Sequence, residues 1–134
     1  MVDSVDAVEY NFSIWNNADY QKSWSLVDKT TGNPLDLTDC TVIIELKDQQ
    51  QVGAPDILKL ETVEDPDVTG IYWLDGEFEE FQVTMRLDDV KDLIPAGSKK
   101  RSLYYDLLIT YPDTYVLKYC YGKVTVTMGS GDNA

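Results

Sequence analysis

Hydrophobic residues recur at every second position in several short stretches of the chain, and this alternation predicts β-strands. The clearest stretch is 35–47, where every second residue from Cys40 to Leu46 is apolar and most residues between them are polar. Clusters of Asn, Asp, Gly and Pro separate the stretches and predict turns between them. The same alternation predicts further strands at 9–15, 20–26, 57–63, 71–74 and 77–87.

A β-hairpin at residues 103–126 is the strongest predicted element. Two runs rich in β-branched and aromatic residues flank Pro112, Asp113 and Thr114, which favour a turn. In the second run, the alternation that includes Leu117 and Tyr119 shifts by one residue after Gly122. A shift of this kind predicts a β-bulge at the glycine.

The segment 88–94 is the one predicted helical turn. We expect Asp88 to cap it, with Val90, Leu93 and Ile94 facing the core. No internal repeat or linker interrupts the chain. Short strands at regular spacing predict an all-β sandwich or barrel. The expected organisation is an N-terminal arm at 1–9, one domain at 10–128 and a C-terminal tail at 129–134.

Length and charge narrow the class of protein. The 134 residues suffice for one domain, and the formal net charge of −13 argues against binding to nucleic acid or to an anionic membrane surface. The first residues are polar and acidic, with no secretory signal, so we expect synthesis in a cytoplasm. Cys40 and Cys120 are therefore expected as buried free thiols, and a disulfide between them is the alternative.

The residue types argue against an enzyme. The chain has no histidine, which removes Ser-His and Cys-His nucleophile systems and most zinc sites, and it has no Gly-rich phosphate loop. Its 24 acidic residues form many accidental pairs, so paired carboxylates do not indicate a glycosidase. No cofactor is expected. Calcium is the weak alternative, because carboxylates cluster at Glu64, Asp65 and Asp67 and again at Asp88, Asp89 and Asp92, without the spacing of an EF-hand.

Three groups of residues are candidates for binding a partner. Aromatic side chains near the N-terminus fit an interface, a glutamine run forms a loop, and one basic run fits an acidic neighbour. Ordinary roles in the core, in a loop and at the solvated start of a strand are the alternatives. The candidates are Tyr10, Phe12 and Trp15, then Gln49, Gln50 and Gln51, and finally Lys99, Lys100 and Arg101.

Several short motifs, in the same order, are similar to those of small tailed-bacteriophage proteins. They are the turn and strand at 33–47, the Tyr-Asp-Leu at 105–107, the Pro-Asp at 112–113 and the Gly-Lys-Val-Thr-Val at 122–126. The chain thereby resembles, over roughly 18–128, the amino-terminal immunoglobulin-like (Ig-like) module of phage baseplate upper proteins. Two features depart from that pattern: Asp39 stands where it usually has glycine, and no long C-terminal extension follows. The resemblance implies an assembly role without catalytic residues.

These observations together predict one Ig-like antiparallel β-sandwich with one short helical turn. The expected function is that of a non-enzymatic virion protein of the tail or baseplate, which binds neighbouring virion proteins and further copies of itself. A capsid-decorating protein on the head is an alternative within this class. An acidic DNA mimic that inhibits a nucleic-acid-binding protein, and a carbohydrate-binding module with exposed aromatic residues, are alternatives from other classes.

Overall fold

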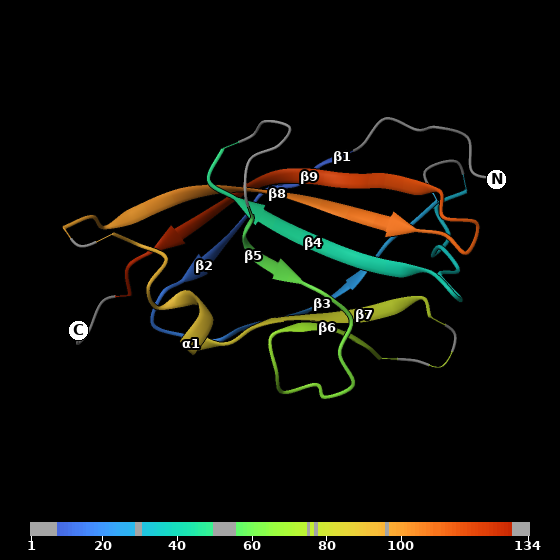
Figure 1. Ribbon diagram of the computed structural model, residues 1–134, viewed down its shortest axis with the longest axis horizontal. Helices are drawn as coiled ribbons and strands as arrows, with labels where there is room; N and C mark the ends of the chain where they lie inside the picture. The colour runs from blue at the N-terminus through green and yellow to red at the C-terminus, as the bar shows by residue number, and fades with distance from the viewer. Residues whose placement is uncertain are drawn as a thin grey trace.

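Two β-sheets packed face to face form the fold of the computed structural model (Figure 1). The structure describes residues 8–28, 31–49, 56–74, 76, 78–95 and 97–129. The predicted all-β sandwich is confirmed. The larger sheet has the order β1 (Val8–Glu9), β9 (Val116–Thr127), β8 (Lys100–Thr110), β4 (Thr41–Lys47) and β5 (Asp56–Leu60), and β2 (Phe12–Trp15) also pairs with β9. The smaller sheet has the order β3 (Tyr20–Ser25), β7 (Glu80–Met85) and β6 (Gly70–Trp73).

The core lies between the two sheets and follows the predicted alternation. In β4, Val42, Ile44 and Leu46 are at most 1% exposed, and the residues between them face outward. Burial of each such side chain stabilises the fold by roughly 1.5–3 kcal/mol. The same alternation buries Phe81, Val83 and Met85 in β7 and Leu103, Tyr105, Leu107 and Ile109 in β8.

The first strands differ from the expected antiparallel arrangement. Most pairs in both sheets are antiparallel, but β1 and β2 run parallel to β9, with Val8 opposite Cys120 and Phe12 opposite Val124. Val8 and Glu9, which the prediction placed in an arm, are therefore paired residues of the sheet. Residues 1–7 and 130–134, the rest of the predicted arm and most of the tail, lie outside the described residues.

A β-bulge interrupts β9, but not at the predicted glycine. Leu107 pairs with Cys120 and Leu108 pairs with Lys118, so Tyr119 is the extra residue. Gly122 is needed for a different reason. A Cβ atom at this position would lie 2.1 Å from the carbonyl oxygen of Tyr10, so only glycine lets the first strands approach β9 so closely.

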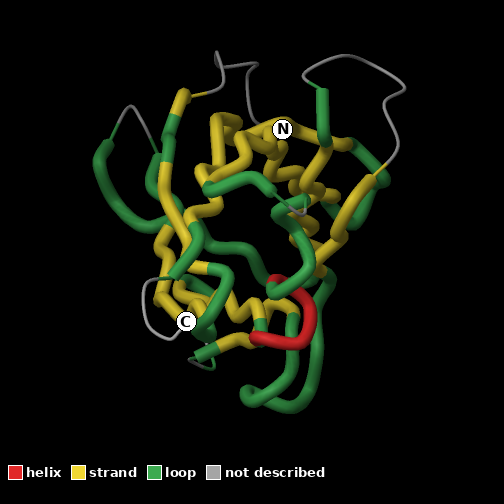
Figure 2. Tube along the Cα trace, turned by 90° about the vertical axis from the view of Figure 1, so that its left-hand side faces the viewer, coloured by secondary structure: helices red, strands yellow, loops and turns green. Residues whose placement is uncertain are grey.

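The short helix α1 (Leu87–Val90), red in the end-on view of Figure 2, follows β7 of the smaller sheet. Its N-cap residue is Arg86, without a side-chain hydrogen bond, so the prediction that Asp88 caps the turn is wrong. Asp19 takes that role from elsewhere in the chain, because its Oδ1 accepts the Leu87 N–H at 2.6 Å. The predicted core residues Val90, Leu93 and Ile94 are buried as expected.

Two smaller expectations concern a turn and the cysteines. Asp39, in the turn before β4, adopts the left-handed conformation (φ 63°), which aspartate tolerates better than most residues other than glycine. No disulfide joins Cys40 and Cys120, and Cys120 is buried as predicted, whereas Cys40 is only half-buried. Among the described residues, no helix has the length and apolar character needed to cross a membrane.

Candidate binding cleft

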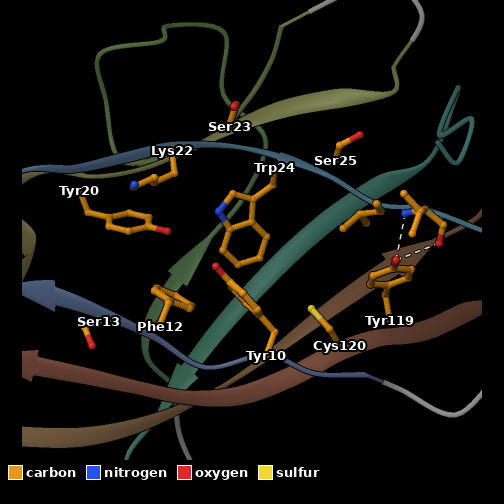
Figure 3. Close-up of a pocket in the computed structure, with 12 residues that line it drawn as sticks. Tyr10, Phe12, Ser13, Tyr20, Lys22, Ser23, Trp24, Ser25, Tyr119 and Cys120 are labelled. Carbon is orange, nitrogen blue, oxygen red and sulfur yellow. Dashed lines mark hydrogen bonds between the residues drawn. The ribbon is translucent and has the colours of Figure 1, made fainter. Parts of the chain in front are cut away.

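A cleft of about 570 Å³ opens along one side of the sandwich, between an edge of the smaller sheet and an edge of the larger one (Figure 3). One wall comes from β3, the edge strand of the smaller sheet, and the other from the segment Tyr10–Ser13 beside β9. Its volume lies within the range of about 300–1,000 Å³ typical of ligand sites. Five aromatic residues are among the twelve that line it: Tyr10, Phe12, Tyr20, Trp24 and Tyr119.

Trp24 is the centre of a network of aromatic rings. Its ring meets those of Tyr10 and Phe12 edge-on, at centroid distances of 5.7 and 5.6 Å and interplanar angles of 84° and 90°. On its inner side it also contacts Tyr105 and Phe81, at 6.3 and 6.5 Å. Edge-to-face pairs of this kind stabilise the fold by about 0.5–1.5 kcal/mol each beyond the area they bury. The network holds the indole in one orientation and gives the cleft a rigid floor.

Lys22 is the one charged residue among those that line the cleft. Successive side chains of a strand alternate between its faces, so Lys22 shares the inner face of β3 with Tyr20 and Trp24. Figure 3 shows it between these two rings. None of the twelve lining residues is acidic, although the chain has 24 acidic residues. The cleft is therefore an uncharged or weakly cationic opening in a strongly acidic protein.

The backbone of β3 forms the upper border of the cleft. Ser23 and Ser25 are among the lining residues, yet their side chains point away from the cleft (Figure 3). The Ser25 hydroxyl donates a hydrogen bond to the Glu79 carbonyl, at 3.2 Å. These serines therefore line the cleft through their main chain. Because β7 is the one neighbour of β3 among the described strands, the other side of β3 presents N–H and C=O groups of an edge strand.

Two tyrosine hydroxyls of the larger sheet bond backbone groups next to the cleft: Tyr119 reaches across to Val27 after β3, and Tyr105 reaches Tyr10 beside β9. The Tyr119 hydroxyl donates to the Val27 carbonyl and accepts from the Val27 N–H, both at 2.9 Å. The Tyr105 hydroxyl donates to the Tyr10 carbonyl at 2.7 Å. Burial is the main cause that raises the pKa of both phenols, and it raises the pKa of Tyr20 as well. All three tyrosines are therefore held neutral in the folded state.

These pKa shifts predict a loss of stability in alkali. A phenol with a raised pKa in the folded state contributes stability below its ordinary pKa of about 10, and this contribution is lost as the pH rises above that value. We expect the urea midpoint to fall between pH 8 and pH 11. The Tyr105→Phe variant should fall by less, because it removes the most strongly shifted phenol. Equal falls in the variant and the original chain would contradict this explanation.

The structure places the predicted partner-binding residues in different regions. Tyr10 and Phe12 lie in the wall of the cleft. Trp15 is 55% exposed and does not line it; Trp15 and Lys100 instead flank Thr127 from the two neighbouring strands. Lys99 and Lys100 are exposed, and so is Gln49, whereas Gln50 and Gln51 lie outside the described residues.

Arg101 has structural contacts that limit it as a docking residue. Its guanidinium forms an ion pair with Asp48 at 3.0 Å and donates to the Leu93 carbonyl at 2.8 Å. These contacts tie β8 to the loop after β4 and to the segment after α1. The predicted basic patch is therefore reduced to its two exposed lysines.

Among the cleft residues that the sequence prediction missed, Lys22 is the charged one. The sequence contains a signal for Lys22. In the predicted strand 20–26 it stands at one of the alternate positions that are otherwise apolar, between Tyr20 and Trp24. A charged residue that points inward from an edge strand is a known protection against uncontrolled strand pairing. Its position therefore marks both the edge and the open side of the sandwich.

The calcium alternative gains no support from the acidic clusters. In the part of the chain that the structure describes, no three acidic, Cys or His side chains are grouped so that they could hold a metal ion. Asp65 instead accepts the Asp67 N–H at 2.9 Å, and Asp89 accepts a hydrogen bond from the Thr69 hydroxyl. These carboxylates order the acidic turn and attach it to α1.

No protein-family model matches the chain, and no curated protein matches it.

Proposed function

We propose that this chain is a non-enzymatic structural protein of a bacteriophage particle, which binds neighbouring subunits in the tail or baseplate. The sequence motifs shared with phage baseplate upper proteins support the phage assignment. The observation that carries the binding role is the open edge of β3 beside the aromatic cleft. A sheet edge and a group of aromatic side chains are both favoured places for contact with another polypeptide.

The strand order supports an Ig-like assignment within this proposal. In variable-type immunoglobulin domains, one sheet contains strands G, F, C and C′, and the other contains B, E and D. The sheets here have the orders β9-β8-β4-β5 and β3-β7-β6, which correspond strand for strand when the chain is followed from β3 as strand B. β1 and β2, which run parallel to β9, then take the place of strand A, the first strand of an immunoglobulin domain.

Quantitative mass spectrometry of purified virions tests the proposal. The copy number is measured against the major capsid protein, in particles of the phage that encodes the chain. The cyclic symmetry of a tail or baseplate predicts about three or six copies, or a small multiple of these. On the order of hundreds of copies would overturn the tail assignment in favour of head decoration. Absence from the particle would overturn the virion assignment and leave the DNA mimic as the hypothesis to examine.

A further inference from the structure

We propose that β3 and the cleft below it bind an extended segment of another polypeptide, which joins the smaller sheet as a fourth strand. Apolar side chains of this segment would enter the cleft, and one carboxylate would face Lys22. This inference rests on the proposed binding role and specifies its chemistry. Three features carry it: the unpaired edge of β3, the shape of the aromatic surface and the charge of the cleft.

The edge of β3 supplies the main-chain contacts. In the part of the chain that the structure describes, the smaller sheet has three strands, and β3 stands at its end with six residues, Tyr20–Ser25, paired to β7 alone. Ser23 and Ser25 turn their side chains away and line the cleft with their backbone. An incoming strand would therefore find hydrogen-bonding groups at the cleft rim, which is the basis of strand addition to a sheet.

The aromatic surface favours side chains over sugar rings. A saccharide stacks on the open face of an aromatic ring, but the Trp24 ring is surrounded by Tyr10, Phe12, Tyr105 and Phe81. Phe12 is likewise stacked against Tyr20, at a centroid distance of 5.4 Å. The result is a groove between ring edges. A groove suits alternate apolar side chains of a strand, each of which removes apolar surface from water.

The charge of the cleft indicates what kind of segment would fit. Lys22 would be left without a counter-charge beside an apolar strand, so a strand with Asp or Glu opposite it is favoured over one without. A second copy of this chain is a poor occupant, because two chains of formal charge −13 would repel each other at close approach. The occupant is therefore a segment of a different protein.

A display library of random decapeptides, panned on the purified full chain, tests this inference without any virion. The expected peptides have apolar residues at alternate positions and one acidic residue. Panning on the Lys22→Glu variant should select Lys or Arg at that position instead. A labelled selected peptide then allows fluorescence-anisotropy titration of further variants.

Two lysine-to-tryptophan substitutions separate the cleft from the rest of the protein surface. Lys22→Trp fills the cleft and should weaken peptide binding by about tenfold or more, equivalent to about 1.4 kcal/mol. Lys59→Trp makes the same change at an exposed residue of β5 in the larger sheet, which does not line the cleft, and should change affinity by less than about twofold. Peptide binding should also slow amide hydrogen exchange in β3. Circular dichroism checks that both variants are folded.

Several results would overturn the inference. One is that the selected peptides show no alternation of apolar residues. Another is that the two tryptophan variants lose equal peptide affinity. A third is that the peptide protects amides outside β3 from hydrogen exchange and not those in β3. Failure of both libraries to yield binders, together with binding of the chain to a glycan array, would assign the cleft to saccharides. The mass-spectrometric test of virions is independent, so presence in the particle with no peptide binding would refute only this inference.

Discussion

Replacing Gly122 by alanine is expected to lower the free energy of unfolding by about 3 kcal/mol, at the upper end of the usual cost of overpacking. The added Cβ would lie 2.1 Å from the Tyr10 carbonyl oxygen and 2.8 Å from Asn11 Oδ1. A backbone carbonyl cannot move aside as the end of a flexible side chain can. The first strands would have to shift away from β9 to relieve the contact.

That shift would break several hydrogen bonds at once. The Tyr10 N–H donates to the Tyr121 carbonyl at 2.8 Å, and the Tyr10 carbonyl accepts from the Tyr105 hydroxyl at 2.7 Å. The Asn11 side chain accepts the Lys123 N–H at 2.7 Å. Each net loss costs about 0.5–1.5 kcal/mol, and more where a buried group is left unsatisfied.

Urea denaturation measures the effect, with Gly76→Ala as the matched control. A Cβ at Gly76 meets no atom within 4 Å, so this variant should be as stable as the original chain to within about 0.5 kcal/mol. A Gly122→Ala variant as stable as the Gly76→Ala variant would contradict the close approach of Tyr10 to β9. Loss of peptide binding in Gly122→Ala would not be informative, since Tyr10 also lines the cleft.

The sequence predicted the strands well because alternation is a local property of the chain. Val42 and Ile44 lie on the same face of the segment once it is extended, whichever strands pair with it, and this face is buried in the core. Pairing between distant strands is not encoded in the same way. Nothing in 8–15 states that these residues run parallel to β9, and their parallel course depends on the space that Gly122 leaves.

The bulge shows how a local signal was assigned to the wrong residue. The sequence has a slip in alternation between Leu117 and Val124, and Gly122 was the natural place for it. In the structure the extra residue of the bulge is Tyr119, because its hydroxyl bonds to the backbone of Val27 at the end of the opposite sheet. A contact so far away in sequence could not be predicted from the alternation.

The cleft was predicted only in part for a related reason. Tyr10 and Phe12 were selected as aromatic residues near the N-terminus that could face a partner, and both line the cleft. The role of Lys22 depends on the fact that β3 ends its sheet and that the sandwich is open beside it. Edge position follows from strand order, which the hydrophobic pattern does not contain.

Replacing Val42 by aspartate is expected to leave the chain unfolded at neutral pH. Val42 is fully buried in β4, opposite Ile109 of β8, between the two sheets. An unpaired carboxylate at this site has an effective desolvation penalty of several kcal/mol. The loss of the two buried methyl groups of valine adds to this cost. The sum is comparable with the total stability of a typical domain, about 5–15 kcal/mol.

The neighbouring Thr41→Asp variant separates this effect from that of added negative charge. Thr41 is exposed on the outer face of the same strand, so its carboxylate remains hydrated, and the free energy of unfolding should change by no more than about 0.5 kcal/mol. Val42→Asn adds a third comparison, because an amide of similar size has no charge and should cost less than the carboxylate. Circular dichroism and urea titration of the three variants decide the result. A folded Val42→Asp variant would show that the space between the sheets is open to water at β4, and would contradict a packed core at this strand.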